Sequence, residues 1–150
     1  IDPYTKEKYN SIYTPVWRWR QNYFNDFQAR MDWCIKSFKD ANHHPVIAIN
    51  GDVDERIHYL DVEAGKSVIL DASASFDPDK HNLKFNWWIY KEAGSFNEVN
   101  DIIKESSNPT VEITIPKTAK GKTIHVILEL EDDNPIVSLR DYRRIVIKVN

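Results

Sequence analysis

What this chain of 150 residues has little of excludes several classes of protein. Cys34 is its only cysteine, which rules out an internal disulfide and a zinc site built from several cysteines. No hydrophobic run approaches the ~20 apolar residues that a membrane-spanning helix needs. The net charge of −3 leaves no excess of cations to neutralise a phosphate backbone. We therefore expect neither a membrane span nor a nucleic-acid partner.

The sequence also lacks an initiator methionine and a recognisable signal peptide, since it begins at Ile1-Asp2-Pro3. We expect it to be an excised part of a longer chain. Its composition, 41% hydrophobic and 29% charged residues, is typical of a globular protein. Its length is sufficient for one domain that is stable on its own hydrophobic core.

Residues 17–42 have the pattern of an amphipathic helix and its exit. Apolar residues recur there at steps of three and four and form one stripe: Phe24, Phe27, Met31, Cys34, Ile35 and Phe38. Asn42 and Pro45 end the pattern. Residues 1–16 show little periodicity, and we expect an extended arm or tail.

After Pro45 the period of the apolar residues changes to two. Short runs rich in β-branched and aromatic residues are separated by turn signals such as Asn50-Gly51 and Asp77-Pro78. The runs are VIAING, HYLDVEAG, SVILDASASF, NLKFNWWIY, TVEITIP, TIHVILELED and RRIVIKVN. This pattern predicts a mainly β protein, with an immunoglobulin-like antiparallel β-sandwich over residues 43–150 preceded by one amphipathic helix.

Two adjacent tryptophans in the fourth run have different predicted roles. Strand side chains alternate between faces, so Trp87 shares an all-apolar face with its second neighbours and is expected in the core. Trp88 and Tyr90 lie on the other face. That face is either a stacking surface for sugar rings or a surface covered by the helix. We favour the helix, because an amphipathic helix beside a half-open sheet usually docks on it.

Trp17 and Trp19 form a second aromatic group, interleaved with Arg18 and Arg20. Aromatic faces beside hydrogen-bonding side chains suit carbohydrate, which makes both tryptophans candidate binding residues together with Trp88 and Tyr90. The alternative is an exposed contact surface for a neighbouring domain, and we favour it.

Acidic residues in two turns suggest a calcium site. In an immunoglobulin-like topology, the turn after the second strand and the last hairpin turn lie at the same end of the sandwich. The candidate ligands there are Asp77, Asp79, Asp132 and Asp133. The alternative is that these side chains only hydrogen-bond their own turns. We expect no other cofactor.

No catalytic group is predicted. Cys34 has no histidine or aspartate at a recognisable spacing, and it is expected to be a small buried hydrophobic residue. Glu129 and Glu131 alternate with leucines and are expected on the solvated face of a strand. The chain itself is therefore expected not to be an enzyme.

Residues 44–150 resemble a divergent PKD-type, immunoglobulin-like domain. The similarity lies in HPVIAING, VEAGKSVILDASASFDPD and LKFNWW, whereas IYKEAGSF stands where that family has Gly-Asp-Gly. This departure means that PKD-type sugar or protein binding does not carry over.

A second resemblance starts upstream, in RWRQNYFNDFQARMDWCIKSFKDANHHPVIAINGD. It is similar to the junction in a family of exported bacterial cellulose-binding proteins that carry a nucleoside-hydrolase-like domain in front of a β-sandwich. The resemblance implies a C-terminal accessory module that orients its own N-terminal hydrolase-like domain, with plant polysaccharide as a candidate ligand. The calcium-binding catalytic cluster of that family lies in the front domain, so hydrolysis of glycosyl bonds is implied only for the full-length protein. Two alternatives stay open: a true carbohydrate-binding module, and a contributor of residues to the hydrolase site.

Overall fold

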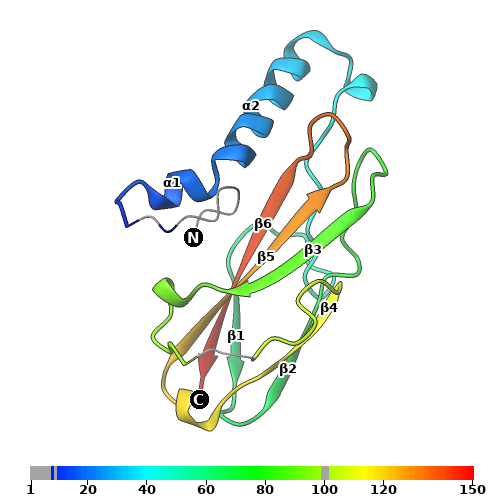
Figure 1. The fold of residues 1–150 in the computed structure, drawn as a ribbon. Helices are drawn as coiled ribbons and strands as arrows, with labels where there is room; N and C mark the ends of the chain where they lie inside the picture. The colour runs from blue at the N-terminus through cyan, green and yellow to red at the C-terminus, as the bar shows by residue number, and fades with distance from the viewer. Residues whose placement is uncertain (1–7, 9, 99–101) are drawn as a thin grey trace.

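The fold is that of a computed structural model, which describes residue 8, residues 10–98 and residues 102–150. Two helices precede six strands (Figure 1). The helices are α1 (Thr14–Arg18) and α2 (Arg20–Ile35), and the strands are β1 (His58–Val62), β2 (Ser67–Asp71), β3 (Leu83–Ile89), β4 (Thr110–Thr114), β5 (Thr123–Asp132) and β6 (Arg140–Val149). No helix in the described ranges has the length and apolar character needed to cross a membrane.

The strands form two sheets, which confirms the predicted β-sandwich. One sheet has the order β1-β6-β5-β3, and the other pairs β2 with β4. The pairing is antiparallel except that β1 runs parallel to β6, with His58 opposite Ile145. This parallel pair follows from the path of the chain before β1. Val46 first forms a bridge with Phe76, in the turn after β2, and the chain then crosses to the other sheet, where β1 is the edge strand beside β6.

The core lies between the sheets and includes Trp87, as the strand alternation predicts. Trp87 is 2% exposed, and its Nε1 donates to the carbonyl of Asn108 at 2.9 Å. Leu83, Phe85 and Ile89 of the same face pack against this core.

The prediction that VIAING, residues 46–51, forms the first strand is wrong. Ile47, Ala48 and Ile49 are all buried, so the segment does not alternate between two faces. A tight turn follows at once, because Asn50 and Gly51 both have positive φ angles and Ile49 exchanges two backbone hydrogen bonds with Asp52. The run is an extended buried segment that ends in this turn.

The predicted helix is also corrected at both ends. It begins at Thr14, with proline in its first turn, so residues 14–16 are helical and not part of an arm. Trp19, at φ −106° and ψ 5°, separates α1 from α2. Lys36 has extended backbone angles and ends α2. The rest of the predicted arm, residues 1–7 and 9, lies outside the described residues.

Candidate functional site

Helix α2 is held on the sandwich by its polar face. Asn22 Nδ2 donates to the Tyr142 hydroxyl at 2.6 Å, and Asn25 Nδ2 donates to the Ser138 carbonyl at 2.8 Å. Ala29 is the buried residue of this helix and packs with Val137 and Leu139. Directional hydrogen bonds around one small apolar contact therefore set the position of α2.

The carboxylate of Asp26 adds to this contact. Asp26 Oδ1 lies 2.9 Å from His44 Nε2, and Arg30 Nε lies 2.7 Å from Asp26 Oδ2. Burial alone would raise the pKa of Asp26, but the hydrogen bonds from Arg30 and His44 lower it below its usual range. The carboxylate of Asp26 is therefore charged at neutral pH and links α2 to the segment that enters the sandwich.

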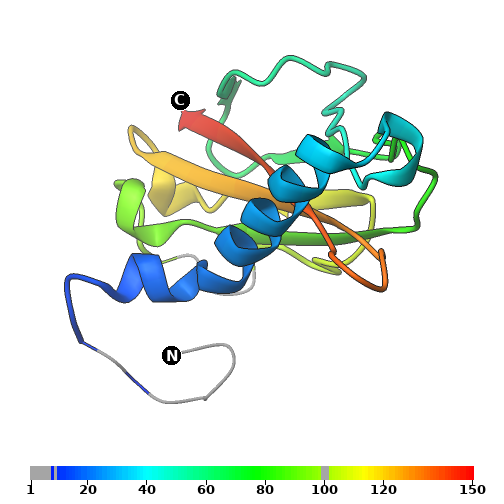
Figure 2. The ribbon, with the colours of Figure 1, turned by 90° about the horizontal axis from the view of Figure 1, so that it is seen from above.

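The apolar stripe of α2 faces away from the sandwich, so the expected docking through this stripe is wrong. Phe24 is 68% exposed, Phe27 61% and Ile35 81%, and Met31 is also exposed. Figure 2 shows the helix lying across the strands as an outer element. We call Phe24, Phe27, Met31 and Ile35 the outer stripe. The helical period identifies an apolar face, but it does not say which partner covers that face.

A groove of about 770 Å³ lies between the helices and the sheet. Its aromatic wall is built around Trp19, whose ring centroid lies 6.2 Å from that of Trp88 and 5.1 Å from that of Tyr142. Tyr90 lies 5.6 Å beyond Trp88. Aromatic rings from the break between the helices, from β3 and its end, and from β6 therefore line one concave surface, as in many ligand pockets.

Charged side chains fix the orientation of this wall. Trp88 Nε1 donates to Glu129 Oε1 at 2.9 Å, and Arg140 Nη1 lies 3.2 Å from Glu129 Oε2. Burial raises the pKa of Tyr142, so its hydroxyl stays protonated and available as a donor. The groove combines fixed aromatic faces with polar groups at their edges.

The structure brings together three of the four predicted carbohydrate residues. Trp19, Trp88 and Tyr90 line the groove, whereas Trp17 is not among its lining residues and lies against Tyr13. Trp19, at the break between the helices, covers Trp88. Trp33 of α2 is not among the lining residues, and its Nε1 donates to the carbonyl of Asn42 at 2.7 Å.

Sequence reasoning missed Arg140 and Tyr142, because the last strand was predicted to start at Arg143. The alternation of Arg140, Tyr142 and Arg144 on one face was the signal that could have found them.

Two expectations about reactive side chains are corrected. Cys34 is exposed, and its thiol donates to the carbonyl of Arg30, so it is not a buried core residue. Glu129 is 7% exposed and holds Trp88 and Arg140, so it is not solvated. Neither residue lies in a nucleophile–base arrangement within the described ranges.

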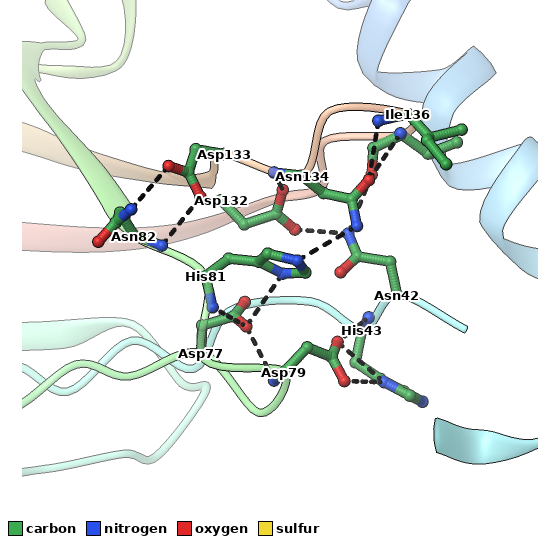
Figure 3. A network of polar contacts seen from close by, with 11 residues as sticks. Asn42, His43, Asp77, Asp79, His81, Asn82, Asp132, Asp133, Asn134 and Ile136 are labelled. Atoms are coloured by element: carbon green, nitrogen blue, oxygen red, sulfur yellow. Dashed lines mark hydrogen bonds and ion pairs between the residues drawn. The ribbon is translucent and has the colours of Figure 1, made fainter. Parts of the chain in front are cut away.

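The acidic turns do meet at one end of the sandwich (Figure 3). Ligand atoms of Asp77, His81 and Asp132 all lie within 4.8 Å of one another. Asp79 accepts instead from the backbone N–H of His43 at 2.7 Å, and Asp133 accepts from that of Asn82 at 2.9 Å. The calcium prediction stays a prediction, and two of its four residues bond elsewhere.

Comparison with known proteins gives a family and a closely similar structure. The family described as "Cellulose-binding protein Sde0182, C-terminal domain" matches residues 67–149. A nucleoside hydrolase-related protein from Saccharophagus degradans, associated with carbohydrate metabolism, is 44% identical with a TM-score of 0.86. The match covers 90% of this chain and 33% of that protein, so the chain spans about a third of its relative.

More distant similarities are weak. Human CDH23 repeats EC21–23 are 9% identical over 71% of this chain and 33% of theirs, with a TM-score of 0.49. The PKD domain of human KIAA0319 is 13% identical over 64% of this chain and 85% of its own, with a TM-score of 0.39. No curated protein sequence matches significantly. The strand order of the two sheets, and not these distant similarities, therefore identifies the fold as a β-sandwich.

Proposed function

This chain belongs to the family of C-terminal domains of the cellulose-binding protein Sde0182, and from that premise we propose that it is a non-catalytic module whose helix α2 orients a preceding hydrolase-like domain. The outer stripe is the observation that carries this proposal. Large apolar side chains gathered on one exposed face mark a surface that another body covers.

The length of the Saccharophagus relative indicates which domain covers the outer stripe. The family is a C-terminal domain, and the match leaves two-thirds of the Saccharophagus protein, which is nucleoside hydrolase-related, outside this fold. Since α2 comes before the first strand, a preceding domain reaches it directly. The hydrogen bonds of Asn22 and Asn25 then fix the angle between that domain and the sandwich.

Single substitutions in the full-length protein test this role. Phe27→Glu places a charge in the outer stripe, whereas Gln28→Glu adds the same charge at a neighbouring exposed position. We expect Phe27→Glu to increase the radius of gyration in small-angle scattering and to expose the junction to protease, and Gln28→Glu to do neither. Unchanged scattering and cleavage in Phe27→Glu and in Phe24→Glu would refute the domain contact.

We extend the proposal to the compartment. The family is named for binding cellulose, a polymer outside the cell, so we propose that the full-length protein is in the periplasm, at the cell surface or outside the cell. Fractionation of cells that express the natural gene tests this placement, and a purely cytoplasmic pool would contradict it.

The aromatic groove supports a second candidate function, carbohydrate binding by this chain itself. Trp88→Ala removes a wall of the groove, and Trp17→Ala removes a tryptophan that is not among its lining residues. If the groove binds glucan chains, insoluble cellulose should retain the wild type and Trp17→Ala but release Trp88→Ala. Failure of the wild-type chain to bind cellulose or soluble cello-oligosaccharides removes this candidate.

A contribution to hydrolysis is the remaining alternative, in which residues 17–20 reach a site in the preceding domain. Activity of the full-length protein that is lost in Arg18→Ala, with an unchanged scattering curve, would favour it over the orienting role.

A further inference from the structure

Three buried side-chain atoms at the end of the sandwich have no hydrogen-bond partner. They are Asn42 Oδ1, Asp77 Oδ2 and His81 Nδ1. The other unpartnered buried side-chain atoms in the described chain are Nε donors of arginines. Native proteins rarely leave buried acceptors unsatisfied, and such groups usually face an ion or an ordered water.

Two buried carboxylates, Asp77 and Asp132, lie beside these atoms, and His81 Nδ1 is 3.4 Å from Asp77 Oδ1. The side chain of Asp77 is fully buried, and Asp132 is 0% exposed. Asp77 Oδ1 accepts from the backbone N–H groups of Asp79 and His81, and the Asp132 carboxylate accepts from Asn134 N and Asn42 Nδ2. Within the described ranges, neither carboxylate forms an ion pair with lysine or arginine. Two buried carboxylates this close to each other favour a bound cation.

We propose that Asp77, His81, Asp132 and Asn42 bind a divalent first-row transition ion, with Zn²⁺ as the probe. Figure 3 shows the Asn42 side chain beside His81, with its oxygen facing the His81 ring. The donor atoms of Asp77, His81 and Asp132 lie within 4.8 Å of one another, and they need to move together by about 1 Å to reach an ion with bonds of about 2.0–2.2 Å.

The donor set favours this class of ion over calcium. Imidazole nitrogen is a ligand of zinc and its neighbours, whereas calcium takes six to eight oxygens. Asp79 and Asp133, which would complete an oxygen shell, bond His43 and Asn82. Two carboxylates, one imidazole and one amide oxygen are a four-ligand set of the size that zinc uses.

A bound ion would join three separate segments of the chain. Asn42 lies just after the helices, Asp77 and His81 lie between β2 and β3, and Asp132 ends β5. The ion would therefore tie the exit of the helical region to the sandwich and increase the stability of the folded state by binding it selectively.

Calorimetric titration of the chelator-treated protein tests the site. We expect Zn²⁺ to bind with a stoichiometry of one and to raise the melting temperature, and Ca²⁺ at the same concentration to produce much smaller effects. A long-range ¹H–¹⁵N correlation spectrum should show the His81 imidazole resonances shifting with the bound fraction, which identifies the ligand directly in the wild type.

Variants locate the ion. Asp77→Asn keeps the oxygen that accepts from the backbone and replaces only the unpartnered one, and His81→Gln removes the imidazole. Each should weaken Zn²⁺ binding at least about tenfold. The controls Asp133→Asn and His58→Gln, which change an acid and a histidine outside the cluster, should bind within about twofold of the wild type.

Three results would overturn the proposal: no heat and no melting shift with Zn²⁺, unchanged affinity in both Asp77→Asn and His81→Gln, or binding of Ca²⁺ in preference to Zn²⁺. If a variant fails to fold, the His81 imidazole resonances of the wild type decide the question. Resonances that do not shift when Zn²⁺ is added would also overturn the proposal.

Discussion

Trp87 and Trp88 show how strongly one step along a strand changes the environment of a side chain. Trp87 is sealed in the core, and Trp88 faces the groove. Trp87→Ala should lower the free energy of unfolding by about 3–5 kcal/mol, because it leaves a cavity and an unpaired carbonyl at Asn108. Urea denaturation measures this loss.

Phe24→Ala is the matched control for that substitution, since Phe24 is an exposed aromatic residue. Its free energy of unfolding should change by less than about 0.5 kcal/mol in this chain. A Trp87→Ala loss as small as that of Phe24→Ala would contradict the placement of Trp87 in the core.

His125 makes stability depend on pH. Burial lowers its pKa from the usual 6.5, and the positive charge of Arg144 lowers it further. The unfolded chain therefore binds more protons than the folded protein as the pH falls below about 6.5, so the free energy of unfolding decreases until the pH passes the folded pKa. Arg144 Nη2 donates to Nδ1 of the neutral ring and favours the same form.

His125→Gln should reduce this dependence, because glutamine offers an acceptor to Arg144 and does not titrate. We expect the loss of stability between pH 7.5 and 5.5 to be smaller in the variant than in the wild type, as measured by urea denaturation at each pH. Identical losses would show that His125 does not contribute.

At the scale of elements, strands were more predictable than the placement of the helix. The alternation of apolar and polar residues identifies the buried face of β3, because successive side chains of a strand point to opposite faces and one short run therefore shows both. The outer stripe of α2 is equally visible in the sequence, yet its partner is not. A helix docked by Asn22, Asn25 and Ala29 uses residues that no apolar periodicity marks. The acidic turns were predictable as a group, but their individual partners depend on side-chain geometry.

Asn25→Ala tests the polar docking of α2. It removes the hydrogen bond to the Ser138 carbonyl, so hydrogen exchange of α2 should become faster by a factor that corresponds to about 1–2 kcal/mol, while β5 and β6 keep their protection. Gln28→Ala, at an exposed position of the same helix, should leave exchange unchanged. Equal exchange in Asn25→Ala and the wild type would show that other contacts hold the helix.

At the scale of the whole molecule, the chain consists of a self-sufficient sandwich and an attached helical region. The main core cluster contains residues from Ile47 to Val149 and none from α1 or α2. The helices add the small cluster around Ala29 and the polar bonds to β6 and to the turn before it. This division suits a module that folds independently and presents a helix to a neighbour.

Residues 41–150 should therefore fold without the helices. This fragment keeps Ala41, which is buried, and Asn42, which donates to the buried carboxylate of Asp132. We expect a cooperative thermal transition and a dispersed ¹H–¹⁵N spectrum in which the β3 and β5 resonances match those of the whole chain, because their core contacts are internal to the fragment. A fragment of residues 45–150 serves as the comparison. It lacks Asn42, so the Asp132 carboxylate loses the hydrogen bond from the Asn42 amide, and the fragment should melt at a lower temperature. An unfolded 41–150 fragment would mean that α2 is part of the folding unit, and the helix would then have to be regarded as a structural layer of the domain.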